Sequence, residues 1–173
     1  MECRGHYIVC RVDGTVEVNE FKGDTTGFFR QVKTDIGAET GEVIEYTRDA
    51  TGKHILDFVC DEEAYMKWDA AERPKHVNRV GTCLYNGMRG GEKVHHILGD
   101  IAFVAQVAGE DGDELVPFGK PACDALAAQM RNMHKTLTEK VPLPAMIADP
   151  VAEVISFKSQ QELVDYLTGK GRK

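Results

Sequence analysis

A hairpin signature opens the chain, where residues 6–21 have the sequence HYIVCRVDGTVEVNEF. The runs His6–Val12 and Thr15–Phe21 are rich in β-branched and aromatic residues, and Asp13 and Gly14 separate them. An Asp-Gly pair between two such runs favours a tight turn, because glycine accepts the positive φ that the turn requires. The sequence therefore predicts two antiparallel strands joined by a short turn.

A second hairpin signature follows after one helical segment. Asp24 is a candidate helix N-cap, and apolar residues at helical spacing follow it as far as Gly37, where the helix is predicted to end. The β-rich runs Glu42–Thr47 and His54–Cys60 come next, joined by the turn-forming residues 49–52. The sequence thus predicts a strand–strand–helix–strand–strand order.

The middle of the chain has weaker signals. Asp61 is predicted to cap a second helix, which Pro74 ends. Residues 86–91 contain three glycines, and we expect a flexible turn there. Ile101–Val107 is predicted to be a buried strand. The acidic residues 110–114 lack the ligand spacing of an EF-hand, so we expect a solvated loop there.

The last third of the chain is predicted to be helical and then linker-like. Pro121 suits the first turn of a long helix that ends near Lys140. Four apolar residues form one stripe on it: Leu126, Met130, Met133 and Leu137. Such a stripe is typical of core packing, and it is also compatible with a seam between two copies. Prolines 142, 144 and 150 then precede a predicted short strand at 151–157 and a predicted short helix from Ser159.

These signals together predict an α+β fold. We expect a mostly antiparallel sheet built from hairpins and packed by a long C-terminal helix and shorter helices. Residues 1–140 are predicted to form a single α+β domain, and residues 141–173 a proline-containing linker with a short strand and helix. A chain of 173 residues can bury about 70% of its unfolded surface, so it needs no disulfide staples.

Composition excludes several classes of protein. The chain is 42% hydrophobic and 28% charged, which is ordinary for a globular protein and argues against disorder. No apolar run approaches the roughly 20 residues that span a bilayer, and the start lacks a signal-peptide pattern. We therefore expect a cytoplasmic location and no membrane partner. The five cysteines are widely spaced and include no Cys-x-x-Cys pair, so we expect reduced, buried thiols.

One basic island interrupts an acidic chain. The net charge is -7, yet residues 73–99 contain five basic side chains and a single acidic one. The candidate ligand- or anion-binding residues of this island are Arg73, Lys75, His76, Asn78, Arg79, Arg89, Lys93, His95 and His96. Such a cluster favours a phosphate group or an acidic protein surface, or else it is a solvated loop that balances the acidic flanks. Nucleic acid is disfavoured because the whole chain is acidic.

No catalytic motif is present. The chain has neither a Gly-x-Ser-x-Gly elbow nor a phosphate-binding P-loop. His95 and His96 are adjacent, so on a strand they would point to opposite faces and would not share a metal ion. The sequence therefore predicts no catalytic residue, no metal site and no cofactor.

Four segments together resemble one known family. They are Gly41–Tyr46 (GEVIEY), Asp57–Glu63 (DFVCDEE), Asn78–Tyr85 (NRVGTCLY) and Leu98–Val104 (LGDIAFV). Over residues 6–107, this arrangement resembles the domain of unknown function 3846, a family common in phages and plasmids of actinobacteria. Val80 stands where the family usually has a small residue, and the family has no assigned activity. The resemblance implies a small accessory protein of a mobile element.

The favoured hypothesis is a small cytoplasmic phage or mobile-element protein that binds a host protein without catalysis, for host takeover or anti-defence. An alternative is a protein that binds or sequesters a small phosphate-bearing ligand such as a nucleotide, through the basic island 73–96. An enzyme that acts on nucleotides with a histidine as base ranks third. A homo-oligomer that uses the 121–140 helix is compatible with each hypothesis.

Overall fold

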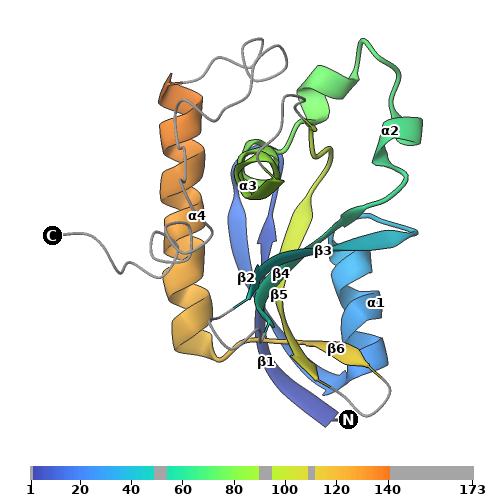
Figure 1. Ribbon diagram of the computed structural model, residues 1–173, viewed down its shortest axis with the longest axis vertical. Helices are drawn as coiled ribbons and strands as arrows, with labels where there is room; N and C mark the ends of the chain where they lie inside the picture. The colour runs from blue at the N-terminus through green and yellow to red at the C-terminus, as the bar shows by residue number, and fades with distance from the viewer. Residues whose placement is uncertain (1, 49–53, 90–94, 109–111, 141–173) are drawn as a thin grey trace, which may run out of the picture.

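The computed structural model describes residues 2–48, 54–89, 95–108 and 112–140. These ranges form a six-stranded sheet with helices on both faces, so the predicted α+β class is confirmed (Figure 1). The elements in chain order are β1 (Glu2–Cys10), β2 (Val16–Asp24), α1 (Thr25–Asp35), β3 (Gly41–Arg48), β4 (His54–Asp61), α2 (Ala64–Lys67), the 3-10 helix η1 (Arg73–His76), α3 (Arg79–Arg89), β5 (Ile101–Ala108), β6 (Asp113–Val116) and α4 (Lys120–Lys140).

The sheet has the strand order β2-β1-β5-β4-β3, and all its pairs are antiparallel. Both predicted hairpins, β1–β2 and β3–β4, are confirmed, and β5 lies between them. The residues Ile101–Val104 of β5 are fully buried, which explains their uninterrupted apolar sequence. The far half of β5 pairs instead with β6.

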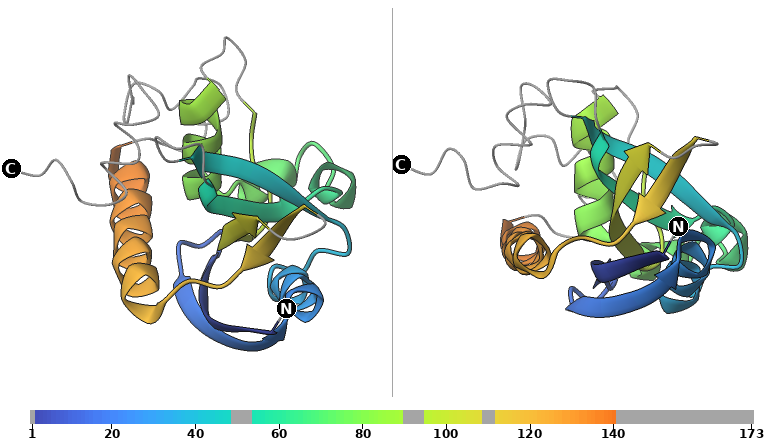
Figure 2. Two further views of the ribbon diagram at one scale, coloured as in Figure 1. Left: turned by 60° about the horizontal axis from the view of Figure 1, so that its bottom comes forward. Right: turned by 90° about the horizontal axis from the view of Figure 1, so that it is seen from below.

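Alternate residues of the strands pack into two separate cores. Tyr7 and Val9 of β1 pack with Phe28 and Val32 of α1 on one face. The intervening Ile8 joins a larger cluster with α3 and α4 on the opposite face. Figure 2 shows α1 apart from α3 and α4, with the sheet between them. The chain is therefore a helix–sheet–helix sandwich.

The β1–β2 turn explains why the chain has glycine at position 14. Arg11 N–H donates to the Thr15 carbonyl at 2.8 Å, so the loop consists of residues 12–14. Gly14 has φ of 89°, and a Cβ atom there would lie 2.2 Å from the ring of His134 on α4. The turn thus needs glycine for its backbone conformation and for its contact with α4.

Helices α1 and α4 begin where the sequence predicts, since α1 follows Asp24 and α4 has Pro121 in its first turn. The Asp24 carboxylate accepts a hydrogen bond from Gly27 N–H at 2.6 Å, which caps α1. The stripe on α4 packs inside the domain, because Met130, Met133 and Leu137 are fully buried and Leu126 packs against the same cluster. The stripe therefore offers no seam for a second copy.

The middle of the chain differs most from the prediction. The helix expected after Asp61 is reduced to the four residues of α2, followed by η1. The flexible turn expected at residues 86–91 is wrong as far as Arg89, because α3 extends to that residue. The spacing of Val80, Cys83 and Leu84 is helical, and the glycines concealed that pattern.

The acidic loop expected at residues 110–114 is also wrong in part. Asp113 and Glu114 belong to β6 and pair with Ala108 and Val107 of β5. The predicted linker, strand and helix of residues 141–173 lie outside the described residues. No helix in the described ranges is both long enough and apolar enough to cross a membrane.

Candidate functional site

The structure brings only part of the basic island together. Arg73 and His96 line one small hollow of about 160 Å³ beside α2. Lys75 is exposed and pairs at 2.8 Å with Glu72, the residue just before η1. His95 is exposed and meets the ring of Tyr85 edge-on.

Three other residues of the island have structural contacts. The ring of His76 stacks on Trp68, with centroids 3.9 Å apart. Asn78 is buried, and its amide donates to the carbonyls of Cys10 and Gly99 at 3.0 and 3.1 Å. Arg79 reaches the Leu137 carbonyl of α4 at 3.5 Å. Asn78 is thus a tie between elements rather than a ligand-binding group.

The last two residues of the basic island, Arg89 and Lys93, have no described side chains. Arg89 ends α3, and neither its side chain nor Lys93 lies within the described residues. Over the described residues, the island therefore forms no single anion-binding cluster.

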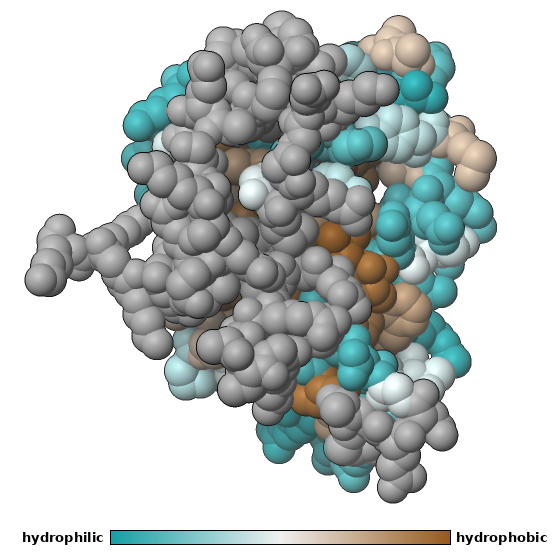
Figure 3. All heavy atoms as spheres, in the orientation of Figure 1, coloured by the Kyte–Doolittle hydropathy of each residue, from teal (hydrophilic) through white to brown (hydrophobic). Residues whose placement is uncertain are grey.

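A protruding surface lies around α2 and η1. We call residues 61–76 the α2–η1 lobe. Among the described residues, its Tyr65 and Met66 are the large hydrophobic side chains that stay exposed, at 46% and 79%. In Figure 3, pale-brown residues interrupt the hydrophilic surface around α2. No local sequence pattern distinguishes these two residues from the rest of the helix expected after Asp61.

The lobe is held rigidly although it contains little regular structure. Tyr65 donates its hydroxyl hydrogen to the His96 carbonyl at 2.8 Å, and the guanidinium of Arg73 lies 5.4 Å from the Tyr65 ring centre. Arg73 also donates to the carbonyls of Tyr65 and Trp68 at 2.8 and 3.1 Å. The hollow next to Tyr65 is mostly apolar, with Pro74, Val77 and Leu98 in its lining.

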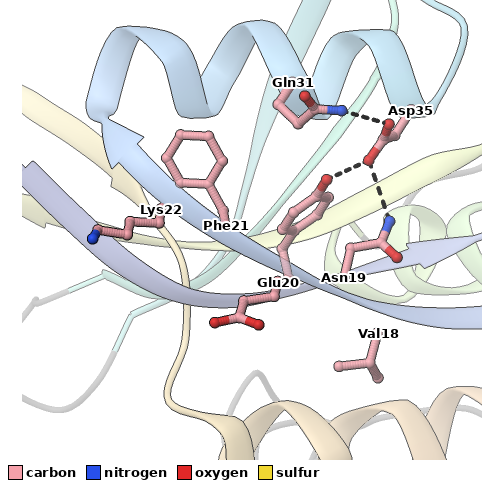
Figure 4. A pocket seen from close by; sticks show the side chains of 8 residues that line it. Val18, Asn19, Glu20, Phe21, Lys22, Gln31 and Asp35 are labelled. Atoms are coloured by element: carbon pink, nitrogen blue, oxygen red, sulfur yellow. Dashed lines mark hydrogen bonds between the residues drawn. The ribbon is translucent and has the colours of Figure 1, made fainter.

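A second hollow runs along β2, with a volume of about 660 Å³ (Figure 4). Beside it, the Asp35 carboxylate at the end of α1 accepts hydrogen bonds from the Tyr7 hydroxyl, from Asn19 at 3.2 Å and from Gln31 at 2.8 Å. Burial, and then the hydrogen bond to Asp35, raise the pKa of Tyr7, so its phenol stays protonated near neutral pH. This cluster joins α1 to β1 and β2, and its three hydrogen bonds occupy the Asp35 carboxylate.

A neighbouring cluster consists of charged side chains that form ion pairs with one another. Arg11 forms ion pairs with Glu17 at 2.7 Å and with Asp100 at 2.9 Å, and it donates to the Asp35 carbonyl at 2.5 Å. Asp100 also accepts from Val12 N–H at 2.9 Å. These contacts fix the β1–β2 turn against α1 and β5.

The cysteines lack the features of nucleophiles. Burial raises the pKa of Cys10, Cys60 and Cys83 to about 12 and that of Cys123 to about 11. The prediction of buried thiols is confirmed for these four, whose thiolate forms are scarce at neutral pH. It is wrong for Cys3 of β1, which is only partly buried. In the described ranges, no three His, Cys, Asp or Glu side chains converge as metal ligands.

No protein-family model, curated protein or solved structure matches this chain. The resemblance over residues 6–107 therefore stays a prediction. The two surfaces with the clearest geometry are the α2–η1 lobe and the outer side of β2.

Proposed function

We propose that this chain is a non-catalytic protein-binding module and that the α2–η1 lobe docks its partner. The observation that supports this proposal best is the exposure of Met66 and Tyr65 beside an apolar hollow. Tyrosine, methionine and arginine are enriched in protein interfaces, and hot spots form where such side chains lie in rigid surroundings.

The rigidity of the lobe favours docking over a passive surface loop. The Tyr65 ring is fixed at its hydroxyl by His96 and at its face by Arg73. A side chain that is already ordered loses less conformational entropy when a partner covers it. The lobe would offer Met66 as a projecting group, and the hollow would take an apolar side chain of the partner.

The biological setting rests on the resemblance and on the composition. We propose a cytoplasmic accessory protein of a phage or another mobile element, whose partner is a host protein. The alternative of a nucleotide-binding protein has less support, because among the described residues of the basic island Arg73 and His96 alone share a hollow.

Site-specific photo-cross-linking in the native host tests this function. A benzophenone amino acid replaces Met66 in one variant and Lys135 in the control, since Lys135 is also well exposed but lies on α4. We expect one discrete protein adduct from position 66, none from position 135, and loss of the adduct when Tyr65→Asp is added. Position 66 without an adduct, or the same adducts from both positions, would contradict the proposal.

A further inference from the structure

The outer edge of β2 has backbone groups that pair with no described strand. Arg11 N–H donates to the Thr15 carbonyl, so the backbone of Thr15 faces β1, and backbone groups that face the same neighbour recur every second residue along an antiparallel ladder. The backbone groups of Asn19 and Phe21 therefore face β1. Those of Val18, Glu20 and Lys22 face outward, and we call this stretch the β2 edge.

One contact with α4 supports this assignment. Val16 belongs to the outward series, and its carbonyl accepts a hydrogen bond from the Arg131 side chain of α4 at 2.8 Å. The hollow along β2 begins two residues after Val16, and residues 18–22 line it. Figure 4 views this edge between α1 and α4, with Asn19 and Phe21 directed toward α1 and Val18 and Glu20 toward α4.

The opposite edge of the sheet is built differently. The β3–β4 register shifts twice, between Glu45 and Thr47 and between Thr47 and Arg48. Such irregularities are a common protection of an edge against added strands. β2, in contrast, keeps an unbroken register with β1 over nine residues.

We infer that the β2 edge pairs with the β2 edge of a second copy of this chain, antiparallel and with Phe21 on the two-fold axis. In this register Glu20 lies opposite Lys22 of the second copy, and Lys22 lies opposite Glu20. Both side chains lie on the same face, because the register pairs them with His6 and Arg4 of β1. The symmetric contact thus contains two opposite-charge pairs.

Charge selects this register over the neighbouring one. A two-fold axis at Glu20 would set two carboxylates directly opposite each other, which destabilises a ladder. Within one chain, Lys22 stands opposite Arg4 and forms no ion pair with a described residue, whereas Glu20 pairs with Arg4 at 3.3 Å. In the dimer, the Glu20 carboxylate of the second copy would be shared between its own Arg4 and this Lys22. An aromatic pair of the two Phe21 rings, each already packed near Phe28, adds to the contact.

Sedimentation velocity of the full chain, from about 1 to 100 µM, tests the inference. We expect a concentration-dependent dimer whose dissociation constant rises about tenfold or more in Lys22→Glu and in Glu20→Lys, since each change sets two like-charge pairs across the axis. The double exchange Glu20→Lys with Lys22→Glu should restore the dimer. Lys75→Glu, an exposed lysine on η1, should leave it unchanged. A wild-type chain that stays monomeric, or a double exchange that fails to restore pairing, overturns the inference.

A cysteine pair tests the position of the axis. Facing residues of a non-hydrogen-bonded pair have Cα atoms about 4.5 Å apart, within the range that a disulfide bridges. In a Cys3→Ser background, Phe21→Cys should yield a covalent dimer on mild oxidation. Asn19→Cys should not, because residue 19 would face residue 23 of the second copy. Equal cross-linking from both positions, or none from position 21, overturns the register.

Discussion

The β2 edge and the α2–η1 lobe are two exposed surfaces built in opposite ways. The β2 edge is a regular strand whose contact groups are backbone amides and carbonyls at a fixed spacing. The lobe has a four-residue helix and one 3-10 helix, and its contact groups are the side chains of Tyr65 and Met66. A regular strand edge can pair with any strand that places opposite charges against its own, and a second copy of the same strand does so. An irregular lobe selects a partner by shape.

The largest expected effect comes from Asn78, the buried side chain that joins the start of α3 to β1 and to Gly99. Asn78→Ala removes hydrogen bonds to the Cys10 and Gly99 carbonyls and the cap on Gly81 N–H, all of them buried. We expect the free energy of unfolding to fall by about 3 kcal/mol, measured by urea denaturation. Asn86→Ala is the matched control, since Asn86 makes similar bonds nearer the surface. Equal losses from both variants would show that burial of Asn78 does not matter.

A second change should break the lobe and spare the β2 edge. Tyr65→Ala removes the ring that Arg73 and the His96 carbonyl hold in place. We expect the affinity for the cross-linked partner to fall about thirtyfold or more, as measured by calorimetry, because hot-spot truncations have this size. Self-association should not change. Tyr65→Phe keeps the ring and should bind within a few-fold of the wild type; a similar loss in both variants would mean that the ring is not the anchor.

A third change weakens the support of β2. Tyr7→Phe removes the donor to the Asp35 carboxylate and leaves Asn19 and Gln31 as its partners. We expect a loss of about 1.5 kcal/mol in the free energy of unfolding, since the bond is partly buried and charge-assisted. Tyr65→Phe, whose hydroxyl bond is exposed, should cost much less. A neutral Tyr7→Phe would show that this hydrogen bond does not stabilise the domain.

The smallest effect is a pH dependence at the β1–β2 turn. Burial, and then the nearby charge of Arg79, lower the pKa of His134, while Asp13 opposes them. The unfolded chain therefore binds this proton more readily, so stability is complete above the ordinary pKa of about 6.5 and falls as pH decreases from there toward the lowered folded value. We expect His134→Gln to flatten this decrease, by on the order of 1 °C in Tm between pH 7 and pH 5. An unchanged pH profile would contradict this assignment.

The sequence predicted the structure best at positions where the residue type has one common structural role. Gly14 and Asp24 mark a turn and a helix cap by their local chemistry, so the first hairpin and α1 were predictable. α3 was missed because the glycines near its end outweighed the apolar spacing of Val80 and Leu84. Loop glycines and helix glycines look alike until tertiary packing is known.

The candidate surfaces were harder to predict than the fold. The basic island was visible as charge, yet Asn78 and His76 proved to be internal contacts. Whether charges converge depends on long-range topology, which β5 sets by inserting between the two hairpins. The exposure of Met66 arises because α2 ends after one turn, and no local pattern announces that end.

Amide hydrogen exchange at low and high protein concentration tests the contrast between the two surfaces most directly. The account predicts that protection in residues 16–24 increases with concentration, at the outward amides of Val18, Glu20 and Lys22, while residues 61–76 exchange at the same rate throughout. Concentration-dependent protection of residues 61–76, with residues 16–24 unchanged, would contradict it, because the lobe would then be the surface that binds a second copy.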